Sequence, residues 1–322
     1  MRPGEHRPHL LRQGPEARRA PVRERRVMPK ELVVISGKGG TGKTSVLASF
    51  AALAKNAVMA DCDVDAADLH LVLAPEIERH EEFRSGRQAI IRAADCIGCG
   101  ACLAHCRFDA VKIDGKAAGD AVFSIDPVSC EGCGVCVRFC PSKAIDFPER
   151  SCGEWYVSRT RFGPMVHARL SIAAENSGKL VSLVRSEARR VAEESARELV
   201  LVDGPPGIGC PVIASVTGAT LVLAVTEPTL SGGHDLKRVL ALARHFGVPT
   251  AVCVNKWDLN PGQADRIEKS ATESGAQVLE RIPYDRGVTA AQVKGKPVVE
   301  TGDCPAARAI TRLWEDMCRR IA

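Results

Sequence analysis

Short apolar runs bounded by turn residues recur along most of the chain and predict its strands. These runs cover residues 31–36, 57–61, 199–203, 219–225, 250–255 and 276–282. Stretches with helical composition or periodicity lie at residues 43–55, 176–196, 231–246, 260–274 and 305–321. Continuously apolar strands that alternate with helices predict an α/β fold, in which helices cover both faces of a mostly parallel sheet.

Residues 79–150 interrupt this alternation. They are rich in Gly and Cys and contain an internal repeat, because CIGCGACLAHC at 96–106 returns as CEGCGVCVRFC at 130–140. We therefore expect residues 28–78 and 151–322 to form the α/β domain and residues 79–150 to form a small inserted domain. After the insertion, apolar segments on either side of RFGP predict a hairpin.

Composition and charge predict a globular body with a basic N-terminal segment. The chain has 322 residues, of which 45% are hydrophobic, enough for a buried core. The net charge of +5 comes from residues 1–27, where eight Arg outnumber three Glu. We expect this segment to be a disordered arm, or to precede a true start at Met28. The rest is neutral, so nothing favours nucleic acid as a partner.

Apolar runs are too short for a membrane protein. None reaches the ~18 residues that a spanning helix needs, and residues 1–27 lack the apolar core of a secretion signal. The fourteen cysteines, in a long chain of this kind, then favour metal or redox chemistry over disulfides. We expect a cytoplasmic protein without stable membrane insertion.

GKGGTGKT at residues 37–44 predicts a phosphate-binding loop. It fits G-x-x-x-x-G-K-[ST] and stands between a predicted strand and a predicted helix. The backbone N–H groups of such a loop wrap phosphates, Lys43 would neutralise the β- and γ-phosphates, and Thr44 would bind Mg²⁺. The loop consists of Gly37, Lys38, Gly39, Gly40, Thr41, Gly42, Lys43 and Thr44.

Aspartates follow two other predicted strands. Asp203 ends the strand LVLVD and precedes a glycine loop, so it could hold Mg²⁺ through water while the loop senses the γ-phosphate. Asp61, Asp63 and Asp65 lie in DCDVD, and one of them could orient the attacking water. The alternatives are that Asp203 caps a turn and that some of the other aspartates cap a helix.

Lys38, DCD at 61–63 and DGPPG at 203–207 together resemble the deviant Walker ATPases. This superfamily includes MinD, ParA, the Mrp-type iron–sulfur cluster carriers and the nitrogenase iron protein. The resemblance covers residues 31–73 and 176–322 and implies ATP and Mg²⁺ as cofactors.

The same resemblance implies a role for each matching residue. Lys38 would reach the nucleotide of the partner in a homodimer formed on ATP binding. Lys43 would be the P-loop lysine, Asp63 the catalytic aspartate and Asp203 the second acidic motif.

NKWD at residues 255–258 leaves both ATP and GTP as candidate nucleotides, because an Asp in such a loop can pair with guanine. In the MinD-like group, however, the residue that matches Asn255 lies against adenine. Pro283, Tyr284 and Asp285 resemble the second base-contacting loop of that group. We favour ATP over GTP because Lys38 and DCD accompany the motif.

Both cysteine blocks follow C-x₂-C-x₂-C-x₃-C. Three cysteines spaced by two fit the corners of one cubane, and the displaced fourth points to the other cluster. The spacing thus assigns Cys96, Cys99, Cys102 and Cys140 to one [4Fe–4S] cluster and Cys130, Cys133, Cys136 and Cys106 to the second. Zinc is the alternative, but zinc sites usually use separated C-x₂-C pairs.

Residues 92–148 resemble a bacterial two-cluster ferredoxin, with Arg107 where that family usually has proline. The whole chain resembles the MinD-superfamily ATPases that contain an inserted ferredoxin domain. Cys210 stands at the offset from Asp203 at which the nitrogenase iron protein has a cluster ligand; the alternative is a buried cysteine that packs a helix start.

Three functions follow from these patterns. The leading one is an ATP-hydrolysing protein whose nucleotide state gates electron transfer through two [4Fe–4S] clusters to an unidentified redox partner. The alternative is a carrier or scaffold for iron–sulfur clusters. The third is positioning, as in MinD or ParA, with residues 311–321 lying on a membrane.

Overall fold

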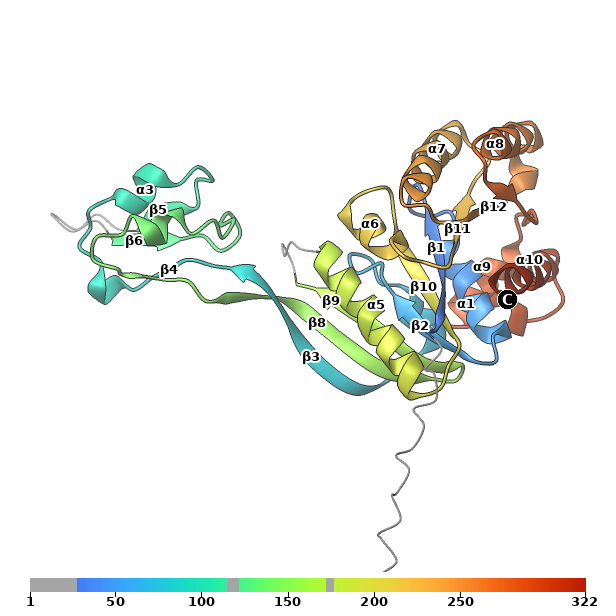
Figure 1. Ribbon diagram of the computed structural model, residues 1–322, viewed down its shortest axis with the longest axis horizontal. Coiled ribbons are helices and arrows are strands. Elements are labelled where there is room, and N and C mark those ends of the chain that lie inside the picture. The colour runs from blue at the N-terminus through green and yellow to red at the C-terminus, as the bar shows by residue number, and fades with distance from the viewer. Residues whose placement is uncertain (1–27, 115–121, 172–176) are drawn as a thin grey trace, which may run out of the picture.

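The computed structural model describes residues 28–114, 122–171 and 177–322. The predicted arm at residues 1–27 lies outside them. Figure 1 shows a large α/β body and a small unit, which are joined by a two-stranded ribbon. In the described part of the chain, no helix has the length and apolar composition to cross a membrane.

A nine-stranded sheet forms the centre of the large body. Its strands are β1 (Lys30–Ser36), β2 (Ala57–Asp61), β3 (Glu76–Arg87), β8 (Glu149–Thr160), β9 (Gly163–Leu170), β10 (Leu199–Pro206), β11 (Leu221–Thr226), β12 (Thr250–Val254) and β13 (Gln277–Val278). The order is β13-β12-β11-β1-β10-β2-β9-β8-β3. Pairing is parallel from β13 to β9, while β8 and β3 are antiparallel to their neighbours. The predicted mostly parallel α/β fold is confirmed.

Helices cover both faces of this sheet (Figure 1). One face carries α5 (Ser177–Glu194), α6 (Cys210–Val216), α7 (Leu230–His245) and α8 (Pro261–Glu273). The other carries α1 (Lys43–Leu53), α2 (Leu69–Leu73), α9 (Arg286–Val293), α10 (Pro305–Ile321) and the 3₁₀ turn η3 (Val298–Glu300). Along β1, Val33 and Ile35 enter one core and Leu32 and Val34 the other, which explains why the parallel strands are continuously apolar.

β3 is a strand that the apolar pattern did not predict. Its sequence EIERHEEFRSGR has no apolar alternation, and only Phe83 and Ser85 are buried in it. Antiparallel pairing with β8 and charge pairs such as Arg159 with Glu76, 2.7 Å apart, hold it in place. The expected domain boundaries at residues 78/79 and 150/151 fall inside β3 and β8, so the ribbon continues the large sheet.

The strand expected at residues 276–282 is shorter than predicted. Only Gln277–Val278 pairs with β12 as a strand, and Ile282 adds one bridge to Asn255. The reason is a register shift: Val252 pairs with Val278 but Asn255 pairs with Ile282, so one extra residue between them interrupts the ladder.

The small unit holds both cysteine blocks. Its elements are β4 (Ile90–Ile91), the 3₁₀ turn η1 (Ala93–Asp95), α3 (Ala101–His105), β5 (Val111–Asp114), β6 (Val122–Ile125), α4 (Val135–Arg138) and β7 (Ile145–Asp146). β4 pairs with β7 and β5 with β6. Ala89, Cys102, Val111, Phe123 and Ile145 form a separate small core, against which several cysteines pack.

Candidate functional site

The phosphate loop joins the carboxyl end of β1 to the start of α1. β10 pairs with β1 and with β2, so Asp203 and Asp61 are register partners at the same edge of the sheet. Because the carboxyl ends of parallel strands meet at one edge, residues far apart in the sequence come together here. The predicted residues Lys43, Asp63 and Asp203 therefore lie in one cluster.

This cluster is buried and ion-paired. Lys43 Nζ lies 2.6 Å from Asp63 Oδ2 and 3.8 Å from Asp203 Oδ1. Thr44 Oγ1 donates a hydrogen bond of 2.7 Å to Asp203 Oδ2. Asp203 is 1% exposed, and its Oδ1 has no hydrogen-bond partner among the described residues. A lysine between two carboxylates offsets much of the cost of burying them.

Burial shifts the protonation of this cluster. It raises the pKa of Asp203 to about 6, against the opposing charge of Lys43 and the hydrogen bond from Thr44. For Lys43 burial lowers the pKa, but Asp203 and Asp63 outweigh it, so the net pKa is raised and the lysine stays charged. The cluster thus holds a permanent cation beside a carboxylate that titrates near neutral pH.

The three aspartates of DCDVD have different surroundings. Asp63 alone among them contacts Lys43. Asp61 is fully buried and accepts hydrogen bonds from the backbone N–H groups of Asp63 and Leu69, at 3.2 and 3.3 Å. Its burial, reinforced by Asp203, raises its pKa well above the usual range. Asp61 therefore shapes the turn into α2, whereas Asp65 is exposed.

Lys38 lies apart from this cluster. Its Nζ is 3.4 Å from a carboxylate oxygen of Glu227 and 3.4 Å from the hydroxyls of Thr229 and Ser231. The lysine therefore rests against the start of α7 and does not contact the carboxylates around Lys43. Nothing in the sequence pattern pointed to Glu227.

A pocket beside the phosphate loop collects the predicted base-contacting residues. Asn255, Pro283, Tyr284 and Asp285 line it together with Gly40 and Gly42 of the loop. Asn255 Nδ2 donates a 2.7 Å hydrogen bond to the carbonyl of Thr41, which ties the end of β12 to the loop. The phosphate loop and the expected base loops thus form one continuous site.

Two aspartates near this pocket accept hydrogen bonds from backbone N–H groups. Asp258 of NKWD is exposed, and its Oδ1 accepts a 2.6 Å hydrogen bond from the N–H of Tyr284. Asp285 caps α9 by accepting from Gly287 N–H at 2.7 Å, and also accepts from Ala306 N–H at 3.2 Å. Burial tends to raise the pKa of Asp285, but these hydrogen bonds outweigh it and lower the pKa. The sequence did not indicate this capping role.

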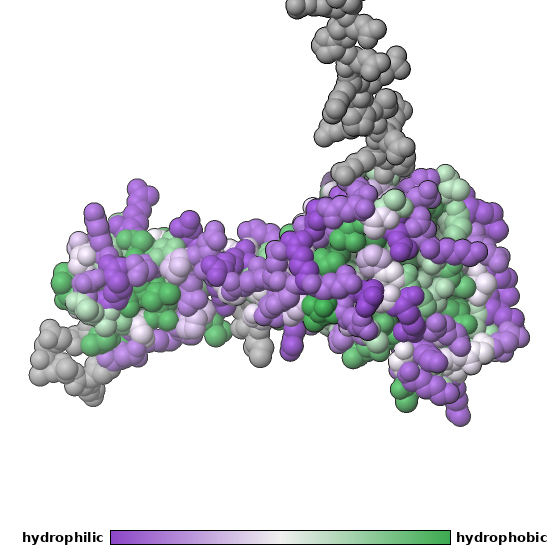
Figure 2. Space-filling model, turned by 90° about the horizontal axis from the view of Figure 1, so that it is seen from below, coloured by the Kyte–Doolittle hydropathy of each residue, from purple (hydrophilic) through white to green (hydrophobic). Residues whose placement is uncertain are grey.

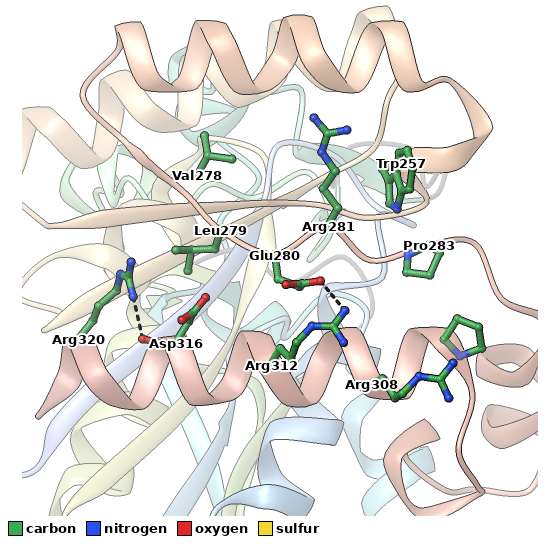
Figure 3. Close-up of a pocket in the computed structure, with 11 residues that line it drawn as sticks. Trp257, Val278, Leu279, Glu280, Arg281, Pro283, Arg308, Arg312, Asp316 and Arg320 are labelled. Atoms are coloured by element: carbon green, nitrogen blue, oxygen red, sulfur yellow. Dashed lines mark hydrogen bonds and ion pairs between the residues drawn. The ribbon is translucent and has the colours of Figure 1, made fainter.

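A wider groove lies between residues 278–283 and α10 (Figure 3). Four arginines line it, but each has a partner: Arg281 pairs with Asp265 and Glu268, Arg308 with Asp303, Arg312 with Glu280, and Arg320 with the Asp316 carbonyl. Carboxylates thus neutralise Arg281, Arg308 and Arg312, whereas Arg320 hydrogen-bonds to the uncharged oxygens of Asp316 C=O and Gln277 Oε1. The groove therefore offers a poorer phosphate site than the backbone N–H groups and lysines of the P-loop.

The two cysteine blocks share a backbone conformation. Gly98 and Gly100 have φ of 68° and 72°, and Gly132 and Gly134 have φ of 62° and 72°. Each second glycine precedes a short helix, α3 or α4, that begins within the cysteine block. The sequence repeat is therefore also a structural repeat.

The structure brings one predicted set of four cysteines together. A small pocket is lined by Cys106 from the first block and by Cys130, Cys133 and Cys136 from the second. Burial raises the pKa of Cys136, and the nearby Cys130 and Cys133 raise it further.

The other predicted set is only partly assembled. Burial raises the pKa of Cys102, and the charges of Cys96 and Cys99 raise it further. Cys140 packs against the same small core, and its Sγ accepts a 3.3 Å hydrogen bond from Ala144 N–H. In the described part of the chain, no three Cys, His, Asp or Glu side chains could hold one metal ion.

Cys210 and Cys152 have opposite environments. Cys210 is the first residue of α6 and is exposed, so the alternative of a buried cysteine that packs a helix start is wrong. Cys152 is buried, and its thiol donates to the carbonyl of Ser85 at 3.1 Å.

Comparison with known proteins decides the family. The sequence model described as "CobQ/CobB/MinD/ParA nucleotide binding domain" matches residues 32–298, most of the chain. The chain belongs to the CobQ/CobB/MinD/ParA family. Its phosphate loop and α/β sheet are therefore those of a P-loop ATPase fold, as the resemblance of Lys38, DCD and DGPPG implied.

Individual relatives agree with this family. A protein of Methanocaldococcus jannaschii is 37% identical over 233 residues, 71% of this chain and 79% of its own. The iron–sulfur cluster carrier protein of Pyrococcus abyssi is 26% identical over 136 residues, 38% of this chain and 46% of its own. The cell division ATPase MinD of Pyrococcus furiosus superimposes with a TM-score of 0.53 at 17% identity, over 91% of this chain and 99% of its own. This last likeness shows the fold.

Proposed function

We propose that this member of the MinD/ParA family is an ATPase whose nucleotide state gates electron transfer through two [4Fe–4S] clusters in residues 88–148. The observation that carries the proposal is the ribbon of β3 and β8, since it is part of the nucleotide-binding sheet and leads directly into the cysteine unit. A change at the nucleotide site has a direct structural connection to the clusters.

A row of register partners runs from the nucleotide site into this ribbon. Asp203, Asp61, His167, Tyr156 and His80 are successive neighbours across β10, β2, β9, β8 and β3. The rings of His167 and Tyr156, and those of Tyr156 and His80, stack with centroids 5.0 Å apart. Burial, aided by His70, lowers the pKa of His167 to about 4, so it is neutral in the stack at pH 7. The row supports coupling between the site and the ribbon.

The buried cluster fits Mg²⁺ and ATP. Asp203 Oδ1 has no hydrogen-bond partner in the described part of the chain, and Thr44 Oγ1 donates to the other oxygen of that carboxylate, so the two residues would hold Mg²⁺. Bound Mg²⁺ would neutralise charge on the β- and γ-phosphates. On nucleotide binding, Lys43 would leave Asp63 and bind the phosphates instead. The Asp63 carboxylate would then be free to orient the attacking water.

Adenine is the base that the pocket favours. Recognition of guanine by NKWD would need a free Asp258 carboxylate, and one of its oxygens already holds Tyr284 N–H. Asn255 and Pro283 line the pocket beside the P-loop. Competition between ATP and GTP for the site tests this assignment directly.

The cysteine unit fits cubane clusters better than zinc. Thiolates that share one zinc ion stand within about 4 Å of each other, whereas each cysteine of a cubane binds its own iron and the four lie farther apart. The pocket that Cys106 shares with Cys130, Cys133 and Cys136 contains the crossed set that the spacing assigns to one cluster. The unit also exposes Ile97, Phe108, Val128 and Phe139, and Figure 2 shows apolar surface on it. A redox partner protein would dock on such surface.

The alternative is a carrier that hands clusters to other proteins. The similarity to an iron–sulfur cluster carrier of Pyrococcus abyssi favours it, and Cys99 and Cys133 are exposed. Transfer to an apo-ferredoxin separates the two functions. A carrier would lose its clusters to the acceptor, while an electron-transfer protein would keep them.

A redox titration tests the proposal. The cluster midpoint potentials, followed by EPR, should differ between the protein without nucleotide, with ADP, and with a non-hydrolysable ATP analogue. A shift of about 60 mV corresponds to a tenfold change in a one-electron equilibrium. Protein that assembles no iron–sulfur cluster after anaerobic reconstitution would refute the redox function altogether.

A further inference from the structure

Glu227 binds two lysines from different loops. One carboxylate oxygen lies 3.4 Å from Lys38 Nζ of the phosphate loop, and the other lies 2.5 Å from Lys256 Nζ of NKWD. Lys256 also donates to the carbonyl of Gly40 at 3.3 Å. The side chain of Glu227 is 15% exposed, so these pairs are shielded from solvent more than a surface pair would be.

The segment that carries Glu227 is packed firmly against the phosphate loop. Thr229 caps α7 by accepting a 2.9 Å hydrogen bond from Gly232 N–H. A Cβ added at Gly232 would lie 2.5 Å from the Glu227 carbonyl, and one at Gly37 would lie 2.5 Å from Asp235 Cβ on α7. These close approaches fix the position of Glu227 relative to Lys38.

We propose that Glu227 is a positioning residue that retains Lys38 in the free subunit and thereby sets the threshold for ATP-dependent dimerisation. The inference rests on the ATPase part of the proposed function and on the role that the family resemblance implies for Lys38, which would reach the nucleotide of the partner subunit. Lys38 cannot bind Glu227 and a distant phosphate together, so its release opposes dimerisation. Lys256 remains with Glu227 after the release, and the carboxylate is therefore not left unpaired.

The variant Glu227→Gln tests this role. It removes the negative charge while keeping the side-chain shape, so we expect the ATP-bound dimer to form roughly three- to tenfold more tightly. Sedimentation with a non-hydrolysable ATP analogue measures the dimer affinity, and nucleotide titration at low protein concentration measures ATP binding separately. Ser231→Ala is the matched control, because it removes an uncharged contact of Lys38 and should change dimerisation less than twofold.

A double variant shows whether the effect passes through Lys38. In the Lys38→Ala background, Glu227→Gln should no longer change dimerisation, since no lysine remains to be released. Equal or weaker dimerisation of Glu227→Gln, or the same gain in both backgrounds, would overturn the role of Glu227. If Lys38→Ala alone leaves ATP-dependent dimerisation intact, the role that the family resemblance implies for Lys38 fails instead, whether or not nucleotide gates electron transfer.

Discussion

At the scale of single residues, the site depends on which carboxylate each cation holds. Lys43 forms an ion pair with Asp63, and Glu227 forms ion pairs with both Lys38 and Lys256. ATP would have to displace the contacts of Lys43, and dimer formation those of Lys38. Nucleotide binding and dimerisation thus exchange existing ion pairs for new ones, which keeps the charges compensated throughout.

Asp203 makes the stability of the nucleotide-free protein depend on pH. Its folded pKa of about 6 lies above the ordinary value of an aspartate, 3.8, so protonation favours the folded state. Its contribution is fully present below pH 4 and is lost as pH rises through 6. We expect Asp203→Asn to be more stable than wild type at pH 8, by about 2 kcal/mol, with the gap shrinking towards pH 5.

Urea unfolding at pH 8 and pH 5 measures this difference. Asp114→Asn is the control, because Asp114 is exposed on β5 of the small unit and lies outside the Lys43 cluster. A gap between Asp203→Asn and wild type that is constant with pH would contradict the buried, titrating Asp203.

The chemistry of several residues was predictable from the sequence, while their partners were not. Lys43, Asp63 and Asp203 follow apolar strands, and strand order in a parallel sheet brings their ends together. The Lys43–Asp63 pair and the contact of Glu227 with Lys38 depend on side-chain positions across loops, which no local pattern encodes. The same holds for Asp285, which caps α9 although it lines the pocket.

At the scale of elements, the loop between β1 and α1 requires glycine at its last turn. Gly42 has φ of 91°, and an added Cβ would lie 2.4 Å from Asn255 Nδ2. We therefore expect Gly42→Ala to destabilise the fold by about 2 kcal/mol, from the left-handed backbone and the clash combined. Gly39→Ala is the matched control, because a Cβ there meets nothing within 4 Å.

Thermal unfolding of nucleotide-free protein compares the two variants. Gly42→Ala should melt several degrees lower, whereas Gly39→Ala should stay near wild type. Equal melting temperatures would show that Asn255 does not press against the loop as described.

The cysteine repeat predicts a crossed pattern of cluster loss. Reconstituted protein should hold about eight irons and eight sulfides per chain. Cys106→Ala should damage the cluster of Cys130, Cys133 and Cys136, with which it shares a pocket. Cys140→Ala should instead damage the cluster of the first block.

Iron analysis and EPR of both variants test whether the fourth cysteine of each block binds the cluster of the other block. Each variant should lose one cluster, and the two should lose different ones. Loss of the cluster within the same block as the substituted cysteine would contradict the crossed arrangement.

Elements with apolar periodicity were predictable, and polar ones were not. The strands β1, β2, β10, β11 and β12 were recognised because both of their faces are buried. β3 was not predicted because most of its side chains face solvent. Its stability comes from pairing with β8, which lies far along the chain. That pairing makes the ribbon part of the large sheet, a relation invisible in the local sequence.

At the scale of the whole molecule, the ribbon separates the small unit from the body that binds the nucleotide (Figure 1). The stacked row of His167, Tyr156 and His80 links the base of the ribbon to the edge where Asp61 and Asp203 lie. From this arrangement we proposed that the nucleotide state gates electron transfer.

Stopped-flow electron transfer tests that claim most directly. Protein with both clusters reduced is mixed anaerobically with an oxidised small ferredoxin, either without nucleotide, with ADP, or with a non-hydrolysable ATP analogue and Mg²⁺. Gating by nucleotide predicts rates that differ by at least about fivefold between the ATP-analogue and nucleotide-free states, and a Lys43→Met variant should show no difference. Equal rates in all three states, in protein that binds the analogue and retains both clusters, would contradict it.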